Sequence, residues 1–348
     1  MKTDKLSLRK PIGATSLALA ASILLVGTPG RAQEFDLTMA VLAAPNTAYT
    51  GMISTIPERI AEATDGRVAI TISDSLVGGP QLAPAVRDGI VPMSGTVHTY
   101  LAAEEPRMGI FNLPGLINDM TEYKFVCDAF WCDDLAELWS EKWNSVVLAE
   151  GAWCVQQLFS KDPIRTIEDF RGKRLRVHNP QTATIMDALG AKPVPLPTSE
   201  IMPALERGVI DGLFTSTCFG NGQEYWRIAK NVQNWALGPI NGWAVLVNQD
   251  AWAEIPPDLQ DAIRAEMAVF QEEALTGYYG FVRAAMEEMK QQGVEFWVAP
   301  QSERDRIFDP KYTDPAYQSF YERAAEVGFD GEAYVQRVRE VLGKDLGQ

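Results

Sequence analysis

One arginine in an apolar setting is the most informative residue of this chain. Arg176 lies between Leu175 and Val177, in a short run typical of a buried strand. An unpaired guanidinium is costly to bury, so Arg176 needs an oppositely charged partner or access to solvent. Its two parallel N–H donors match the two oxygens of a carboxylate. From the residues alone, two interpretations stay open: an internal ion pair or exposed edge position, and a site for a small organic anion.

Residue patterns typical of catalysis or metal binding are missing. The sequence has only two histidines, His98 and His178, and contains neither G-x-S-x-G nor H-E-x-x-H. No C-x-x-C pair occurs, and adjacent carboxylates such as Glu272-Glu273 fall on predicted helix faces, where solvation accounts for them. We therefore expect no catalytic residues, no metal and no cofactor, and a function in binding rather than catalysis.

The elements that would position Arg176 alternate between strands and helices. The pattern begins with strands predicted at 36–43, 68–73 and 91–97 and helices at 48–64 and 78–89. A second such unit has strands at 174–177, 193–195 and 209–215 and helices at 181–189 and 200–207. Further strands are expected at 145–150, 155–160, 232–237 and 243–248, and an amphipathic helix at 121–143. This alternation implies an α/β fold with parallel sheets covered by helices on both faces.

A long helix is predicted from Pro257 to about Gln292, because apolar residues recur there every three or four positions. A helix of about 35 residues is roughly 50 Å long, which is enough to brace two lobes, with a bend expected at Gly277 and Gly280.

Two successive α/β units predict a two-lobed molecule with a hinge. We expect lobe I to comprise residues 33–154 plus about 242–285, and lobe II to comprise 155–241 plus about 286–348. Ligands of such folds lie outside the carboxyl ends of the strands, in the crevice between lobes.

The first 32 residues have the order of an export signal. Four of the first ten are basic, an apolar run occupies 12–26, and the small residues Gly30 and Ala32 follow. The apolar run is shorter than the roughly 20 residues that span a bilayer. We therefore predict cleavage near Ala32, a periplasmic location and no stable membrane insertion.

The charge balance restricts the partners. The chain carries a formal net charge of −15, and the predicted signal contributes +4, so the remaining 316 residues carry −19. Nucleic acid and anionic membrane surfaces are therefore unsuitable partners. A site for an anion must be built locally, against the overall field.

The four cysteines leave their redox state open. Cys127 and Cys132 are five residues apart on one predicted helix, an awkward separation for a disulfide. Cys154 and Cys218 lie in separate segments that can approach each other. Buried thiols that pack as small apolar groups, or a single disulfide in an exported protein, both fit the sequence.

A long segment carries a resemblance to a known family. From Lys161 to Phe214 the chain reads KDPIRTIEDFRGKRLRVHNPQTATIMDALGAKPVPLPTSEIMPALERGVIDGLF. It resembles the solute receptors of tripartite ATP-independent periplasmic (TRAP) transporters of the DctP type. The matching blocks are Glu168–Lys173, Arg174–Val177, Leu189–Ala191, Ser199-Glu200, Ala204-Leu205 and Gly208–Gly212. A weaker likeness covers almost the whole chain after the signal.

The resemblance implies a fold, partners and a mechanism. The fold is that of a two-lobed periplasmic binding protein (type II-like) with a hinge and a long bracing helix. The partners are a small organic anion and the small and large subunits of a membrane permease, and we expect the receptor itself to be a monomer. In this family the arginine equivalent to Arg176 forms a paired salt bridge with the ligand carboxylate while the lobes close.

Departures from the family pattern predict the ligand class. Gln156 stands where the family often has a second arginine, and Thr215 stands where it commonly has asparagine. Leu42 replaces a residue that is often polar in sugar-acid receptors. The site is therefore expected to favour a monocarboxylate, such as an aromatic, hydroxy or keto acid. A dicarboxylate receptor of the same family, and a ligand sensor for a signalling partner, are the alternatives.

Other candidate ligand-binding residues have a structural alternative. Asn179 either caps the following helix or contacts ligand, and His98 is a ligand contact or a hydrogen-bonded structural residue. Thr96 and Thr198 offer hydroxyl donors. Aromatic residues in segments expected to edge the cleft either stack on a flat ligand or fill the core; they are Trp153, Phe159, Phe214, Phe219 and Trp243. Of these, Phe214 and Trp243 are the favoured ligand contacts.

Overall fold

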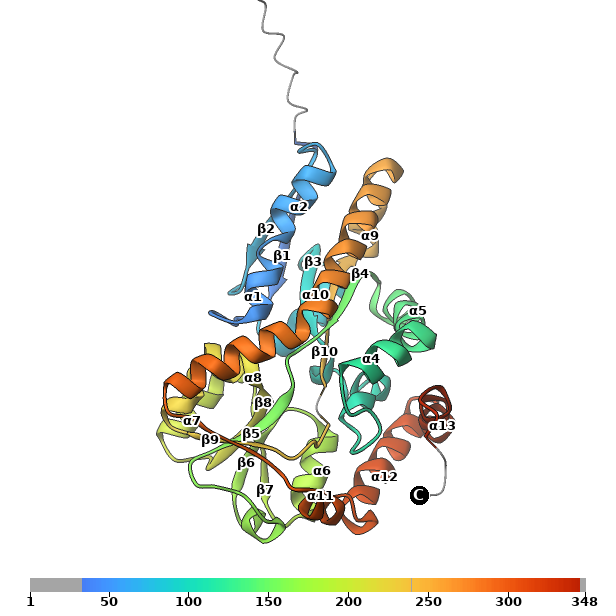
Figure 1. Ribbon diagram of the computed structural model, residues 1–348. Coiled ribbons are helices and arrows are strands. Elements are labelled where there is room, and N and C mark those ends of the chain that lie inside the picture. The colour runs from blue at the N-terminus through green and yellow to red at the C-terminus, as the bar shows by residue number, and fades with distance from the viewer. Residues whose placement is uncertain (1–32, 239, 345–348) are drawn as a thin grey trace, which may run out of the picture.

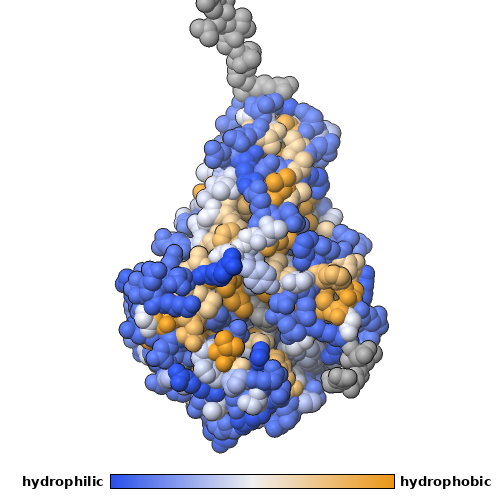
Figure 2. All heavy atoms as spheres, in the orientation of Figure 1, coloured by the Kyte–Doolittle hydropathy of each residue, from blue (hydrophilic) through white to orange (hydrophobic). Residues whose placement is uncertain are grey.

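The computed structural model describes residues 33–238 and 240–344 (Figure 1), so the predicted export signal lies outside the described residues. The chain forms two sheets, each with helices packed against it, in two lobes. Within the described ranges, every helix is either too short or too polar to cross a membrane. Hydrophilic residues cover most of the face in Figure 2, and hydrophobic residues appear there in separate patches.

The first lobe is built on a five-stranded sheet of order β2-β1-β3-β10-β4. Its strands are β1 (Phe35–Val41), β2 (Val68–Ser73), β3 (Met93–Val97), β4 (Ser145–Ala152) and β10 (Gly242–Asn248). The connecting helices are α1 (Ala48–Ile53), α2 (Ile56–Ala63) and α3 (Leu82–Arg87). Strand β1 is parallel to β2 and β3, whereas β10 is antiparallel to β3 and β4.

The helix predicted at 48–64 is divided into α1 and α2. Pro57 lies in the first turn of α2, where its missing N–H is tolerated. The same residue in the interior of one continuous helix would remove a hydrogen bond and clash with the preceding turn. The backbone therefore turns at Ser54 and Thr55 and starts a new helix.

The second lobe is built on a six-stranded sheet of order β11-β9-β5-β8-β6-β7. Its strands are β5 (Gln156–Ser160), β6 (Arg174–Val177), β7 (Lys192–Pro195), β8 (Gly212–Ser216), β9 (Asn231–Asn234) and β11 (Glu295–Val298). Helices α6 (Pro180–Ala188), α7 (Ile201–Glu206) and α8 (Thr217–Gly222) connect them. Strand β6, which carries Arg176, lies between β7 and β8 and is parallel to both.

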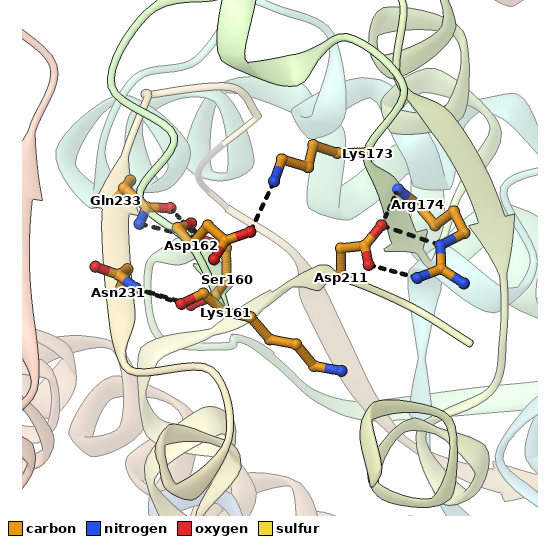
Figure 3. A network of polar contacts seen from close by, with 8 residues as sticks. All are labelled: Ser160, Lys161, Asp162, Lys173, Arg174, Asp211, Asn231 and Gln233. Carbon is orange, nitrogen blue, oxygen red and sulfur yellow. Dashed lines mark hydrogen bonds and ion pairs between the residues drawn. The ribbon is translucent and has the colours of Figure 1, made fainter. Parts of the chain in front are cut away.

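A network of polar side chains fixes the strand order at one end of this sheet (Figure 3). Asp211 accepts hydrogen bonds from the backbone N–H of Arg174 at 2.8 Å and from its Nε at 3.0 Å. Ser160 and Gln233 join β5 to β9 by a side-chain contact of 3.1 Å. Asp211 in the G-V-I-D-G motif thus has a structural role, since it holds the start of β6 against β8.

Three connections pass between the lobes. Strand β4 leads into β5, β9 leads back to β10, and the helix α10 (Pro257–Gln291) packs on α2 and β4 of the first lobe and on α8 of the second. The predicted long helix is confirmed, and Figure 1 shows that α10 changes direction part-way along its length. The sheets draw their strands from 35–152 with 242–248, and from 156–234 with 295–298; we propose the predicted lobe boundaries on that basis.

The remaining helices complete the two lobes. They are α4 (Met120–Val126), α5 (Cys132–Trp143), α9 (Gln249–Ala253), α11 (Gln301–Ile307), α12 (Pro310–Glu326) and α13 (Gly331–Val341). Short 3-10 segments occur at Gly79–Gln81, His98–Tyr100, Pro106–Asn112, Ile167–Phe170, Thr198–Glu200 and Tyr225–Arg227.

The four cysteines form two disulfides, whereas the sequence had left buried thiols or a single disulfide as the two interpretations. The helix predicted at 121–143 contains a π-helical segment, Cys127–Trp131, between α4 and α5. This wider turn places the Cα atoms of Cys127 and Cys132 4.7 Å apart, within disulfide range, which a regular α-helix would not allow. The second disulfide joins Cys154, between β4 and β5, to Cys218 in α8.

Candidate ligand-binding site

A small cavity of about 40 Å³ lies where strands of the two sheets end. It is formed by the ends of β1, β3, β6 and β8 and by the start of the antiparallel strand β5. Its lining residues are Leu42, Val97, Thr99, Tyr100, Trp153, Gln156, Arg176, His178, Thr198, Thr215, Ser216, Phe219 and Asn241. Both lobes therefore contribute walls, as expected for ligand sites outside the carboxyl ends of strands.

Arg176 is buried in the wall of this cavity, with 2% of its surface exposed. Its Nε donates to the carbonyl of Leu196 at 2.9 Å and its Nη1 to the carbonyl of Phe214 at 2.8 Å. These neutral acceptors orient the guanidinium without balancing its charge. Burial lowers the pKa of Arg176, an effect that the neighbouring hydroxyls of Tyr100 and Tyr225 oppose. Among the described residues, no carboxylate pairs with it and Nη2 makes no hydrogen bond.

Arg174, two residues earlier on β6, provides the contrast. Its Nη2 lies 2.5 Å from Oδ1 of Asp211, and the hydrogen bonds from Arg174 hold the pKa of this carboxyl below its ordinary value. Arg174 is partly exposed, whereas Arg176 is buried. The partly exposed arginine thus has a protein carboxylate as its partner, and the buried one, which faces the cavity, does not.

His178 is the next cavity residue after β6 and the sequence patterns above do not single it out. Its Nε2 lies 2.6 Å from Nδ2 of Asn241, and Oδ1 of Asn241 accepts a hydrogen bond from Asn112. If the side-chain nitrogens of Asn112 and Asn241 are both donors, Nε2 of His178 is an acceptor and the ring proton resides on Nδ1. Burial, and then the charge of Arg176, lower the pKa of His178 to about 3. His178 is therefore neutral at physiological pH.

Strand periodicity is the sequence pattern that could have identified His178 as a cavity residue. Residues at positions i and i+2 of a strand lie on the same face, so a cavity that contains Arg176 at the end of β6 also receives the side chain two positions later. Tyr100 and Asn241, which also line the cavity, have no comparable local signal, because their positions depend on how the lobes meet.

Four of the predicted ligand-binding residues line the cavity: Arg176, Gln156, Thr215 and Thr198. Nε2 of Gln156 donates to the carbonyl of Cys154 at 3.1 Å, which fixes the amide beside the start of β5. Thr198 belongs to the second lobe, and its Oγ1 lies 3.4 Å from the hydroxyl of Tyr100 in the first. The cavity is thus closed on one side by a contact between lobes.

The polar residues near the end of β3 that were predicted to bind ligand lie away from the cavity. Strand alternation places Val97 in the cavity wall and directs Thr96 to the opposite face. His98 is fully buried, and its Nε2 lies 2.9 Å from Oε2 of Glu150. The ring of Trp139 also donates to Glu150, at 3.1 Å. His98 therefore has the structural role that was the alternative interpretation.

The two favoured aromatic contacts also lie outside the cavity wall. Trp243 on β10 packs against Tyr49 and Phe270, over Gly151, where a side chain would collide with its ring. The ring of Phe214 fills the core of the second lobe, and only its carbonyl reaches Arg176.

Trp153 and Phe219, two other members of the predicted aromatic set, do line the cavity. Their ring centroids are 6.1 Å apart in an edge-to-face arrangement, and Trp153 is stacked on Tyr49 at 4.5 Å. With Leu42 and Val97 they form an apolar wall.

Asn179 caps helix α6 and lines a neighbouring chamber instead of the cavity. Its Oδ1 accepts a hydrogen bond from the backbone N–H of Thr182 at 2.8 Å. The chamber contains His178, Thr99 and Tyr100 as well, so it adjoins the cavity.

Comparisons with known proteins agree with this architecture. A solute-binding protein of Roseobacter denitrificans is 26% identical over 264 residues, covering 73% of this chain and 79% of the relative. A monocarboxylate 2-oxoacid-binding periplasmic protein of Nostoc sp. is 27% identical over 221 residues, covering 60% of this chain and 59% of the relative. The solved structure of a Bordetella pertussis extracytoplasmic solute receptor binding pyroglutamic acid superposes with a TM-score of 0.79 at 20% identity, covering 87% of this chain and 99% of that one.

Residues 39–324 match the model of the family described as bacterial extracellular solute-binding protein, family 7 (DctP). The predicted two-lobed fold and the resemblance to TRAP solute receptors are thereby confirmed. The chain belongs to family 7 of the bacterial extracellular solute-binding proteins.

Proposed function

We propose that this protein captures a small organic monocarboxylate from the periplasm by closing its two lobes, and delivers it to the membrane subunits of a TRAP transporter. The observation that carries the proposal is Arg176: a buried guanidinium, oriented by two carbonyl groups, that faces a cavity and has no carboxylate partner among the described residues. A buried charge of this kind is costly unless it is paired. The carboxylate of the ligand would supply the missing partner.

The composition of the cavity wall supports a single carboxylate. Arg176 is the only lysine or arginine among the lining residues, and His178 is neutral. A second carboxylate would therefore be buried without a cation, which is unfavourable. The apolar wall around Trp153 and Phe219 suits a compact, flat or cyclic ligand body.

The uncharged polar residues would hold the other oxygens of the ligand. Gln156, Thr215 and Thr198 lie in the same wall as Arg176 and supply hydrogen-bonding groups without charge. Such residues suit the hydroxyl, keto or amide group of a substituted acid. This agrees with the names of two similar proteins, which refer to 2-oxoacids and to pyroglutamic acid.

The proposed role in transport rests on the family and on the predicted export signal. Cleavage near Ala32 would release a periplasmic receptor, which we expect to be monomeric. Closure excludes water and strengthens the contact between Arg176 and the carboxylate. The closed form would then dock on the small and large permease subunits.

The first test replaces Arg176 by alanine. Isothermal titration calorimetry with pyroglutamate, pyruvate and phenylpyruvate should show at least about a 100-fold loss of affinity, because a desolvated charge pair is lost. Arg174→Ala is the matched control: it removes an arginine from the same strand, but one paired with Asp211, and should leave affinity nearly unchanged. Tight binding by folded Arg176→Ala protein would contradict the proposal.

The second test determines the ligand class. Thermal shift assays compare these three monocarboxylates with succinate and malate. A ligand present at 100 times its dissociation constant adds about 2.7 kcal/mol to the free energy of unfolding. We expect stabilisation by at least one monocarboxylate. Stabilisation by the dicarboxylates alone would favour a dicarboxylate receptor of the same family.

A further inference from the structure

A second chamber adjoins the ligand cavity and is larger, at about 480 Å³. The two share Thr99, Tyr100 and His178, so these side chains form the partition between them. The outer chamber is lined by residues of both lobes and by Arg323 of α12, which packs against α6. The outer chamber therefore lies next to the cavity, on the opposite side of Tyr100.

Arg323 brings a positive charge that none of the described residues pairs with. It is half-buried in the chamber wall and makes neither a hydrogen bond nor an ion pair with any described residue. Arg59, by contrast, forms an ion pair with Glu266 at 2.7 Å.

Asn179 adds a second, independent feature. It is 5% exposed and lines the same chamber, and its Oδ1 is used by the cap of α6. Its Nδ2 is buried and has no hydrogen-bond partner among the described residues. A buried donor without a partner is costly, and the nine-residue helix α6 starts beside it. Helix N-termini favour negative charge.

We infer that the outer chamber is a second binding site for a carboxylate anion, formed by Arg323 and Asn179, and that it receives the ligand before transfer to Arg176. The inference rests on the proposed function, because it assigns an entry step to the same ligand. It also answers an electrostatic difficulty: the formal charge of −19 expected after removal of the predicted signal repels an approaching anion, and a local cation at the entrance offsets that field. Tyr100, which contacts Thr198 across the lobes, separates the two sites.

The first experiment locates the outer site without knowledge of the natural ligand. Acetate is titrated into labelled protein, and the side-chain signals of Arg323 (Nε–Hε) and Asn179 (Nδ2) are followed by NMR. Arg323→Lys and Asn179→Ala assign these signals by removing them. We expect saturable shifts of both between about 1 and 100 mM acetate, as suits a weak site. The shifts should persist in Arg176→Ala protein, where the inner site is disabled.

The second experiment measures entry. Stopped-flow tryptophan fluorescence, to which Trp153 in the cavity wall contributes, follows association of pyroglutamate. Arg323→Gln should slow association roughly threefold at low ionic strength, and the difference should disappear near 1 M salt, where charges are screened within about 3 Å. Arg323→Lys should restore the rate. Arg283→Gln, which removes an equally charged, exposed residue of α10 outside both cavities, is the matched control.

The outcomes separate this inference from the proposed function. Absence of saturable acetate shifts at Arg323 and Asn179 would overturn the outer site, whether or not Arg176 binds ligand. Equal slowing by Arg323→Gln and Arg283→Gln would overturn its role in entry. If pyroglutamate does not bind at all, the acetate titration alone decides the outer site.

Discussion

Three basic side chains at alternate positions, 174, 176 and 178, have different protonation and pairing because their surroundings differ. Arg174 is partly exposed and paired with Asp211. Arg176 is buried and held by two carbonyl groups, and His178 is neutral because burial and the adjacent guanidinium disfavour a second positive charge. A neutral His178 leaves Arg176 as the single cation of the cavity, which restricts the ligand to one buried carboxylate.

His178 should make the protein less stable in acid. Its pKa is about 3 in the folded state and about 6.5 when unfolded, so the unfolded state binds an additional proton between these values. Stability therefore falls as pH decreases below 6.5, by up to about 1.4 kcal/mol per pH unit. His178→Gln removes this dependence. Urea unfolding at pH 7, 6, 5 and 4.5 should show a flatter acid limb for the variant, whereas parallel curves would contradict the assignment.

At the scale of elements, the β4–β5 connection between the lobes is covalently tied to helix α8. The Cys154–Cys218 disulfide joins the β4–β5 connection to α8, and both segments carry cavity residues, Trp153 and Phe219. The Cys127–Cys132 disulfide instead closes a π-helical turn between α4 and α5. One bond restricts a long segment of the chain, and the other restricts a local turn.

The two disulfides should differ in their contribution to stability. Their cysteines are 64 and 5 residues apart, and the entropy lost by the unfolded chain grows with the length of the closed loop. Cys154→Ser/Cys218→Ser should cost about 4 kcal/mol and Cys127→Ser/Cys132→Ser about 2 kcal/mol. Denaturant unfolding under non-reducing conditions measures both, each double variant serving as the control for the other. A larger loss from the short loop would show that local packing, rather than loop entropy, dominates.

At the scale of the whole molecule, the lobes meet through contacts outside the cavity. Nε2 of Gln223, just after α8, donates to the carbonyl of Pro45 in the first lobe at 3.0 Å. Beside it, Gly222 lies so close to Asn46 that an added Cβ would be 2.5 Å from the Asn46 carbonyl oxygen. This close approach between the lobes requires glycine, because backbone atoms on the opposite side cannot move aside as a flexible side chain would.

Gly222→Ala should therefore hold the lobes apart. Closure becomes less favourable, and affinity for the carboxylate should fall about tenfold although no cavity residue changes. Calorimetry measures the affinity, and small-angle scattering measures whether the ligand still makes the protein more compact. Gly280→Ala is the matched control: its Cβ would meet nothing within 4 Å, and it should raise helix stability by up to about 1 kcal/mol. Unchanged affinity in Gly222→Ala would show that this contact does not limit closure.

Sequence reasoning predicted the elements with strong periodicity and missed local interruptions. The strands at 68–73 and 174–177 and the long helix α10 follow the predicted ranges, because their apolar spacing is regular. The helices predicted at 48–64 and 121–143 are divided, the first at Pro57 and the second by a π-helical segment. A proline within a periodic run is visible in the sequence, whereas a change of helical hydrogen bonding inside an amphipathic pattern is not.

By itself, the sequence determined the family and the position of Arg176 at the end of a strand, because both depend on an ordered local motif and on strand periodicity. Only the tertiary structure decided which side chains share the cavity with it. Thr96, His98, Phe214 and Trp243 are close to the site in sequence, but strand alternation and core packing direct them elsewhere. Tyr100, Trp153 and Asn241 come from segments that meet Arg176 only when two lobes close around one space. The pairing of a charge is likewise a property of its surroundings: Arg174 and Arg176 are alike in sequence, and only burial and the position of Asp211 distinguish them.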